Sequence, residues 1–139
     1  MQLQGKTALI TGASVVIGGT IARFFAVEGC NLILSGRSAE KLHELEKEIS
    51  RPEIKVYSIA TDVSKKAEVV NLVQFAKEKF GNLNIIVTAA GFYGSIGPLA
   101  QSEPEEWMEA LEVNLLGTAM TIKYCLPLLD KKNKNKIIT

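Results

Sequence analysis

The sequence has few of the residues that build disulfide frameworks or metal sites. It contains two cysteines, Cys30 and Cys125, far apart in the chain, and one histidine, His43, in a charged segment. We therefore expect neither a disulfide framework nor a metal site. No apolar run approaches the ~20 residues that span a bilayer, and no signal-like apolar segment follows Met1. These absences predict a protein of the reducing cytoplasm with no membrane partner.

An excess of charge of one sign is also missing. Sixteen lysines and arginines are balanced by fifteen aspartates and glutamates, giving a formal net charge of +1. This balance gives no basis for binding nucleic acid or an anionic surface. With 47% hydrophobic and 22% charged residues, the composition is that of a globular protein. We predict a single domain over residues 1–139.

Short β-branched segments alternate along the chain with longer helical patterns. Several of the predicted strands are nearly continuous apolar runs, typical of a parallel sheet covered on both faces. The predicted strands are Thr7–Ile10, Asn31–Leu34, Ile54–Ile59, Leu83–Val87 and Lys136–Thr139.

Helix signals fill every interval between these strands. Hydrophobic residues recur at a spacing of four at Ile17, Ile21 and Phe25. Ser38 and Ser64 are predicted N-caps of the next two helices. Ser102-x-x-Glu105 is a predicted capping box that opens a helix running to about Leu129. The apolar residues of this last helix are expected in the core or in a subunit contact: Trp107, Met108, Leu111 and Leu115.

The order β-α-β-α-β-α-β-α-β predicts an α/β fold with a doubly wound parallel sheet. Ligands of such sheets bind beyond the carboxyl ends of the strands, near the point where the strand order reverses. We predict the functional site at that edge, because the residues there are small or polar: Thr11-Gly12, Gly36-Arg37, Thr61-Asp62 and Thr88–Gly91.

The loop after the first strand is a candidate phosphate-binding loop. A helix N-terminus offers unpaired N–H groups and a partial positive charge, which suit a pyrophosphate. Gly12 permits a tight turn, and Gly18 lets the helix approach the strand closely. Glycines at this spacing also occur in plain strand-to-helix turns, so the loop alone leaves both interpretations open.

Taken together, these motifs resemble the short-chain dehydrogenase/reductase family. Thr11, Gly12 and Gly18 match the Thr-Gly-x-x-x-Gly-x-Gly motif of its single-domain members, with Val16 in place of the middle glycine. The segment Thr88–Gly91 resembles the family's Asn-Asn-Ala-Gly in its last two residues. The resemblance covers nearly all of the chain, and it implies a Rossmann-like domain that is incomplete at its C-terminal side.

The resemblance implies a nicotinamide dinucleotide cofactor, and the sequence favours NADP over NAD. No carboxylate lies between Asn31 and Ala39, where an NAD-binding fold usually holds the ribose 2′-hydroxyl. Arg37 can instead pair with a 2′-phosphate; alternatively, it is only an exposed residue at a helix start. The cofactor-binding residues that we predict are Gly12, Ser14, Ile17, Gly18, Arg37, Asp62, Val63, Ala89, Ala90 and Gly91.

Asp62, one of these residues, and Val16, in the candidate phosphate-binding loop, carry further predictions. Asp62 either binds the adenine amine, as the resemblance implies, or caps the helix that follows it. Val16 is expected to collide with the dinucleotide, and a positive φ there would add roughly 1–3 kcal/mol of strain. We therefore predict that Val16→Gly tightens NADPH binding.

The resemblance also implies which catalytic residues are present. The family's reaction uses a serine, a tyrosine, a lysine four residues after the tyrosine, and an asparagine that holds a water in a proton relay. Asn114, in a Val-Asn context like the family's, is the catalytic candidate, and a purely structural asparagine is the alternative. No Tyr-x-x-x-Lys occurs after Tyr57, Tyr93 or Tyr124.

We predict the cofactor-binding front part of an NADP(H)-dependent oxidoreductase that interconverts a ketone and a secondary alcohol. The chain by itself is expected to be inactive and to form a homo-oligomer through the helix over 102–129. The alternative prediction is a catalytically inactive dinucleotide-binding or association module. A further sequence beyond Thr139 containing the serine and Tyr-x-x-x-Lys would favour the enzyme.

Overall fold

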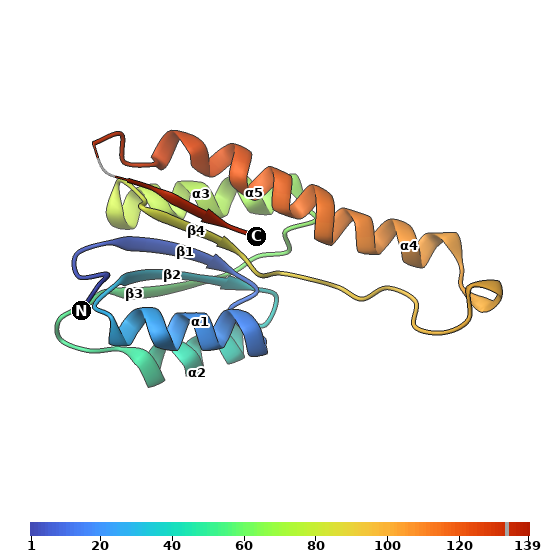
Figure 1. The fold of residues 1–139 in the computed structure, drawn as a ribbon, viewed down its shortest axis with the longest axis horizontal. Coiled ribbons are helices and arrows are strands. Elements are labelled where there is room, and N and C mark those ends of the chain that lie inside the picture. Colours follow the sequence, from blue (N-terminus) through green and yellow to red (C-terminus); the bar gives the residue numbers. More distant parts are fainter. Residues whose placement is uncertain (133) are drawn as a thin grey trace.

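The computed structural model describes residues 1–132 and 134–139 as a parallel five-stranded sheet between two layers of helices (Figure 1). The sheet order is β3-β2-β1-β4-β5, so the order reverses between β1 and β4. The predicted doubly wound α/β fold is confirmed. The strands are β1 (Thr7–Thr11), β2 (Asn31–Gly36), β3 (Val56–Ala60), β4 (Ile85–Thr88) and β5 (Lys136–Ile138).

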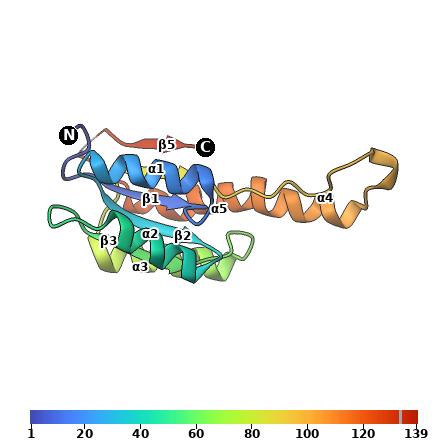
Figure 2. The same ribbon diagram turned by 90° about the horizontal axis from the view of Figure 1, so that it is seen from below.

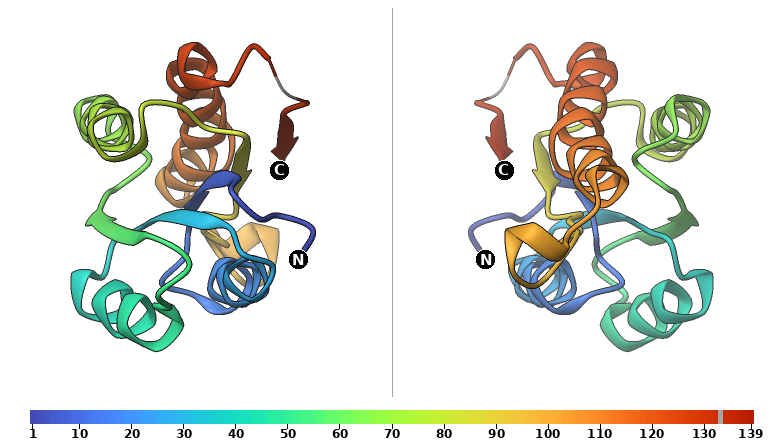
Figure 3. Two further views of the ribbon diagram at one scale, coloured as in Figure 1. Left: turned by 90° about the vertical axis from the view of Figure 1, so that its left-hand side faces the viewer. Right: turned by 90° about the vertical axis from the view of Figure 1, so that its right-hand side faces the viewer.

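Helices α1 and α2 cover one face of the sheet, and α3 and α5 cover the other (Figures 2 and 3). The helices are α1 (Val16–Val27), α2 (Ala39–Ile49), α3 (Lys66–Phe80), α4 (Pro104–Leu111) and α5 (Thr118–Cys125). A π-helical segment, η2 (Glu112–Gly117), joins α4 to α5, and short 3-10 turns occupy η1 (Leu99–Gln101) and η3 (Leu126–Leu128). No helix in the described ranges is both long and apolar enough to cross a membrane.

The central strands are apolar because each of them faces two cores. Ile10 of β1 lies in register with Leu34 and Val87, and all three side chains belong to the core under α1 and α2. The alternate residues of the same strands point to the core under α3 and α5: Leu9, Ile33 and Ile86. Side chains of a strand alternate between faces, so two helical layers require apolar residues at every position.

Helix α1 packs closely on the sheet through small residues. Its buried positions are Gly18, Gly19, Ala22 and Ala26. Of the predicted apolar stripe, Ile21 and Phe25 pack against the core, but Ile17 is 68% exposed, so its assignment to that buried face is wrong. The helix starts so close to β1 that the side chains between them must be small.

Of the three predicted helix N-caps, one is confirmed and two lie one residue further along the chain. Ser38 does cap α2, with its Oγ accepting a bond from the Lys41 amide at 3.4 Å. The N-cap of α3 is Lys65 and not Ser64. The capping box of α4 is formed by Glu103 and Glu106, because proline favours the first helical position, and this makes the residue before Pro104 the cap.

The segment between β4 and α5 projects beyond the carboxyl edge of the sheet (Figures 1 and 2). The apolar residues that α4 and η2 carry there are exposed: Trp107, Met108, Leu111 and Leu115. The expectation that they lie in the core of this chain is therefore wrong. Their role in a subunit contact stays a prediction.

Candidate functional site

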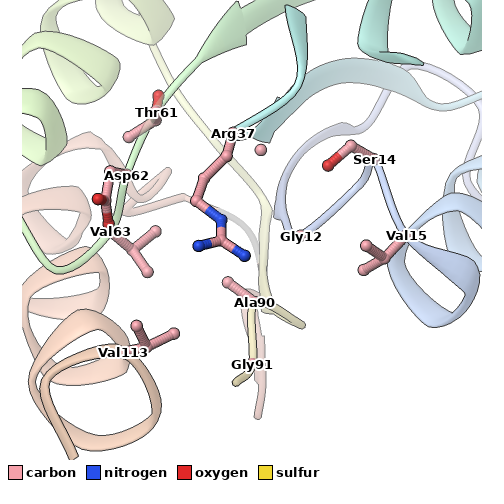
Figure 4. Close-up of a pocket in the computed structure, with 11 residues that line it drawn as sticks. Gly12, Ser14, Val15, Arg37, Thr61, Asp62, Val63, Ala90, Gly91 and Val113 are labelled. Atoms are coloured by element: carbon pink, nitrogen blue, oxygen red, sulfur yellow. The ribbon is translucent and has the colours of Figure 1, made fainter. Parts of the chain in front are cut away.

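A cavity opens at the carboxyl edge of the sheet, around the point where the strand order reverses (Figure 4). Seven predicted cofactor residues line it: Gly12, Ser14, Arg37, Asp62, Val63, Ala90 and Gly91. Four further lining residues were not predicted as contacts: Val15, Gly36, Thr61 and Val113. Gly36 and Thr61 belong to the strand ends at which the functional site was predicted, although neither was predicted as a cofactor contact. Val113 comes from η2 and is the valine of the Val-Asn pair that marked Asn114.

Gly12 shapes the floor of the cavity. Its φ is +68°, which confirms the predicted turn. A Cβ atom on Gly12 would lie 2.6 Å from the carbonyl carbon and oxygen of Ala89 and from the Ala90 nitrogen. A Cβ on Gly18 would in turn collide with the Gly12 carbonyl group. The two glycines therefore let the end of β4, the loop and the start of α1 pack together.

The first turn of α1 has backbone amides that could bind an anion. No side chain caps this helix, and its first turn contains no acidic residue. The Val15 amide donates to the Gly12 carbonyl at 3.3 Å, and the Gly19 amide donates to the Val15 carbonyl at 2.9 Å. The amides between them, in the first turn, have no carbonyl of the preceding turn to bind.

Val16 is the first residue of this helix. It has no positive φ, so the backbone strain considered for this position does not arise. Its side chain is 83% exposed, beside Val15, which is 55% exposed. Two branched apolar side chains therefore stand at the helix N-terminus, where an anion would approach.

Polar groups gather where β1 and β2 end. A Cβ on Gly36 would collide with the Ser14 hydroxyl group, so glycine lets the Ser14 side chain lie against the end of β2. The next residue, Arg37, extends its guanidinium into the space between Val63 and Gly12 (Figure 4). A hydroxyl and a guanidinium thus line the same cavity.

Asp62 anchors the turn between β3 and α3. Its Oδ1 accepts bonds from the Ser64 amide at 3.0 Å and from the Ser64 hydroxyl at 2.7 Å. These bonds hold the pKa of the Asp62 carboxyl below its usual value, against an opposing effect of burial, and the charges of Lys65 and Arg37 lower it further. Asp62 is therefore not the N-cap of α3, and its ionised carboxylate lines the cavity.

A second cavity adjoins the first one on the side of the projecting segment. Its walls include predicted residues that do not reach the first cavity, namely Ile17, Ala89 and Asn114. Val15, Val16, Gly91, Phe92 and Tyr93 complete it. The structure thus distributes the predicted residues over two neighbouring cavities, which share Val15 and Gly91, except for Gly18, which is buried and lines neither.

Asn114 connects η2 to the chain that leaves β4. Its Oδ1 accepts a bond from the Phe92 amide, and its Nδ2 donates to the Phe92 carbonyl, both at 2.8 Å. The side chain thereby fixes the position of the segment that borders the second cavity. The side-chain oxygen and nitrogen of Asn114 therefore both bind Phe92. These bonds support the structural role that the sequence left open as the alternative to catalysis. Segments of π-helix frequently mark functional sites.

Replacing Asn114 with alanine removes both bonds to Phe92. We expect the Phe92 amide to exchange its hydrogen faster, and the unfolding free energy to fall by about 1 kcal/mol, as for a pair of partly solvated hydrogen bonds. Asn114→Asp keeps the acceptor and is the matched variant, so its Phe92 amide should stay protected. Equal exchange rates at Phe92 in the alanine variant and the parent would contradict the assigned contact.

The two cysteines add no chemistry to this site. Cys30 and Cys125 are free and buried. Burial raises the pKa of both thiols to about 12. Neither cysteine lines the two cavities just described. A neutral, buried thiol is a poor nucleophile.

Residues 6–139 match the family model described as short chain dehydrogenase. An uncharacterized oxidoreductase of Staphylococcus saprophyticus is 37% identical over 139 residues, which cover 99% of this chain and 59% of that protein. An uncharacterized oxidoreductase of Staphylococcus aureus is 34% identical over 136 residues, covering 98% of this chain and 58% of that protein. The chain therefore spans less than two thirds of the length of these relatives.

Two solved structures agree with these matches. An alcohol dehydrogenase from the archaeon Thermococcus sibiricus, complexed with 5-hydroxy-NADP, superposes with a TM-score of 0.87 at 34% identity, covering 96% of this chain and 57% of that chain. The L-sorbose reductase from Gluconobacter frateurii, complexed with NADPH and L-sorbose, has a TM-score of 0.90 at 29% identity, covering 99% and 52%. With the family model matching nearly its whole length, the chain belongs to the short-chain dehydrogenase family.

Proposed function

We propose that the cavity at the carboxyl edge binds NADP, and that the chain is the cofactor-binding portion of a reductase that interconverts a ketone and a secondary alcohol. One observation carries the choice of NADP: Arg37 and Ser14 line the same cavity, and no carboxylate lies between Asn31 and Ala39 along β2 and its end. Two of the solved relatives carry 5-hydroxy-NADP and NADPH, which supports the same cofactor class for this chain.

The chemistry at the end of β2 fits a 2′-phosphate. A planar guanidinium offers paired N–H donors to a phosphate, and a hydroxyl adds a further hydrogen bond. Arg37 is exposed and therefore free to adapt to a ligand, whereas Ser14 is partly buried against Gly36. A ribose with a free 2′-hydroxyl would offer Arg37 no charged partner of its own.

The remaining contacts in the proposal follow the strand ends. The first-turn amides of α1 at Ile17 and Gly18 would bind the diphosphate. Asp62 and Val63 would bind the adenine, and the small residues Ala89, Ala90 and Gly91 would make room for the ribose and nicotinamide. When bound, the cofactor supplies the hydride. Asn114 would position the segment of Phe92 beside it, because its amide already holds that backbone.

The proposal is tested by titrating the 139-residue chain with NADPH and with NADH in a calorimeter. We expect NADPH to bind at least about tenfold more tightly, as for one charge-assisted contact. Equal affinities would contradict the assignment of Arg37. We also expect no decay of NADPH absorbance with a panel of ketones, because the sequence contains no Tyr-x-x-x-Lys, and measurable turnover would contradict this part.

A second candidate function is an inactive dinucleotide-binding module that associates with a partner. The exposed apolar side chains of α4 and η2 favour association, and they also support the proposed homo-oligomer through residues 102–129: Trp107, Met108, Leu111 and Leu115. Both candidates share the cofactor site and the proposed cytoplasmic location. Coding sequence beyond Thr139 with a serine and Tyr-x-x-x-Lys would favour the reductase.

A further inference from the structure

We propose that Val15 and Val16 make this chain discriminate between the two halves of its dinucleotide. On this proposal, the adenosine half with its 2′-phosphate binds without contacting Val16, whereas the diphosphate and nicotinamide half meets an apolar obstruction. The ratio of its affinity for a 2′-phosphorylated adenine mononucleotide to its affinity for NADPH is then higher than it would be with glycine at position 16. This inference rests on the proposed binding of NADP.

The obstruction lies between the two cavities. The first cavity contains Arg37 and Asp62, and the second contains Asn114. Val15 lines both of them, and Val16 lines the second. A ligand long enough to occupy both cavities therefore passes between the two shared residues, Val15 and Gly91, and meets Val16 in the second cavity.

The chemistry of the crossing point is unfavourable for a diphosphate. Val15 and Val16 are 55% and 83% exposed, so their methyl groups stand out from the helix end. An anion placed against them gives up water without gaining a hydrogen bond from the side chains. The branched side chains also hold the anion away from the amides of the first turn, the groups that would stabilise it.

The adenosine half avoids this obstruction at position 16. Val16 does not line the first cavity, whose polar walls come from Ser14, Arg37 and Asp62. A ligand that ends at its 5′-phosphate does not need to extend past the helix N-terminus. Substitution of Val16 should therefore separate the two halves of the ligand in a binding experiment.

The test is a calorimetric titration of the 139-residue chain, Val16→Ala and Val16→Gly with two ligands, adenosine 2′,5′-bisphosphate and NADPH. We expect the bisphosphate to bind all three proteins with affinities within about twofold. NADPH affinity should rise about tenfold in Val16→Gly, as for relief of one overpacked contact, and by less in Val16→Ala. Val70→Ala and Val70→Gly are matched controls, because Val70 is an exposed valine of α3 outside both cavities.

The possible outcomes distinguish a failure of this inference from a failure of the proposed function. Unchanged NADPH affinity in Val16→Gly would overturn the inference and leave cofactor binding intact. An equal rise for both ligands would also overturn it, because a general effect on the fold would then explain the gain. Failure of every variant to bind either ligand would overturn the proposed function itself.

Discussion

Replacing Gly12 with alanine is expected to lower the free energy of unfolding by about 2–5 kcal/mol and to abolish NADPH binding. Two costs add up. A side chain in the left-handed region costs roughly 1–2 kcal/mol, and Gly12 has a φ of +68°. Forcing an extra carbon into a packed contact costs about 1–3 kcal/mol more.

The second cost depends on backbone atoms that have little freedom to move. The new Cβ would lie 2.6 Å from the Ala89 carbonyl group and from the Ala90 nitrogen. Both residues directly follow β4, which is hydrogen-bonded to β1 and β5 and buried. The Ala90 amide also approaches the Thr11 hydroxyl, at 3.4 Å. Relief of the collision would therefore require the ends of β1 and β4 to separate at the floor of the cavity.

Gly5 provides a matched control. Its φ is +74°, close to that of Gly12, but a Cβ there would meet nothing within 4 Å. Gly5→Ala should therefore show only the backbone cost. Urea unfolding of both variants measures the difference, and calorimetry measures the loss of NADPH binding. Equal destabilisation of the two variants would refute the role of the close approach to β4.

Replacing Arg37 with alanine should weaken NADPH binding by about 10- to 100-fold and leave NADH binding nearly unchanged. The loss corresponds to a charge-assisted hydrogen-bond pair, worth about 1.5–3 kcal/mol. Only a ligand with a 2′-phosphate uses this pair, so the selectivity for NADPH should disappear together with the affinity.

The measurement needs a control for the change in net charge. Arg51→Ala removes another exposed arginine, which follows the far end of α2 and does not line the cavity. Its NADPH affinity should match that of the parent. The dependence of NADPH affinity on salt should also become shallower in Arg37→Ala only. A similar loss of affinity for NADH and NADPH would show that Arg37 supports the fold of the pocket and does not bind the 2′-phosphate.

Many of the elements could be predicted because their signals are local. The apolar runs of β1, β2 and β4 predict a sheet that is covered on both faces, and the register confirms it. Small and polar residues at the strand ends predicted most of the lining of the first cavity. The parallel strands bring those ends to one edge, even though the residues are far apart in the chain.

The misses arise where packing between distant segments decides the outcome. Ile17 continues an apolar spacing of four, yet α1 lies so near β1 that its small residues are buried and Ile17 is exposed. Ser102 has the sequence of a capping residue, but its Oγ donates to the Leu99 carbonyl and accepts from the Trp107 indole. The helix then takes Glu103 as its cap.

The sequence by itself determined the order of strands and helices along the chain, the parallel sheet and the edge that carries the site. Hydrophobic periodicity and turn residues act over a few neighbouring residues, so these features can be predicted locally. Only the tertiary structure decided that Asn114 holds the backbone of Phe92 and that Val113 lines the first cavity. It also decided that Val15 stands between two hollows. These features depend on distances between segments that the chain brings together only after the sheet has formed and the helices have packed on it.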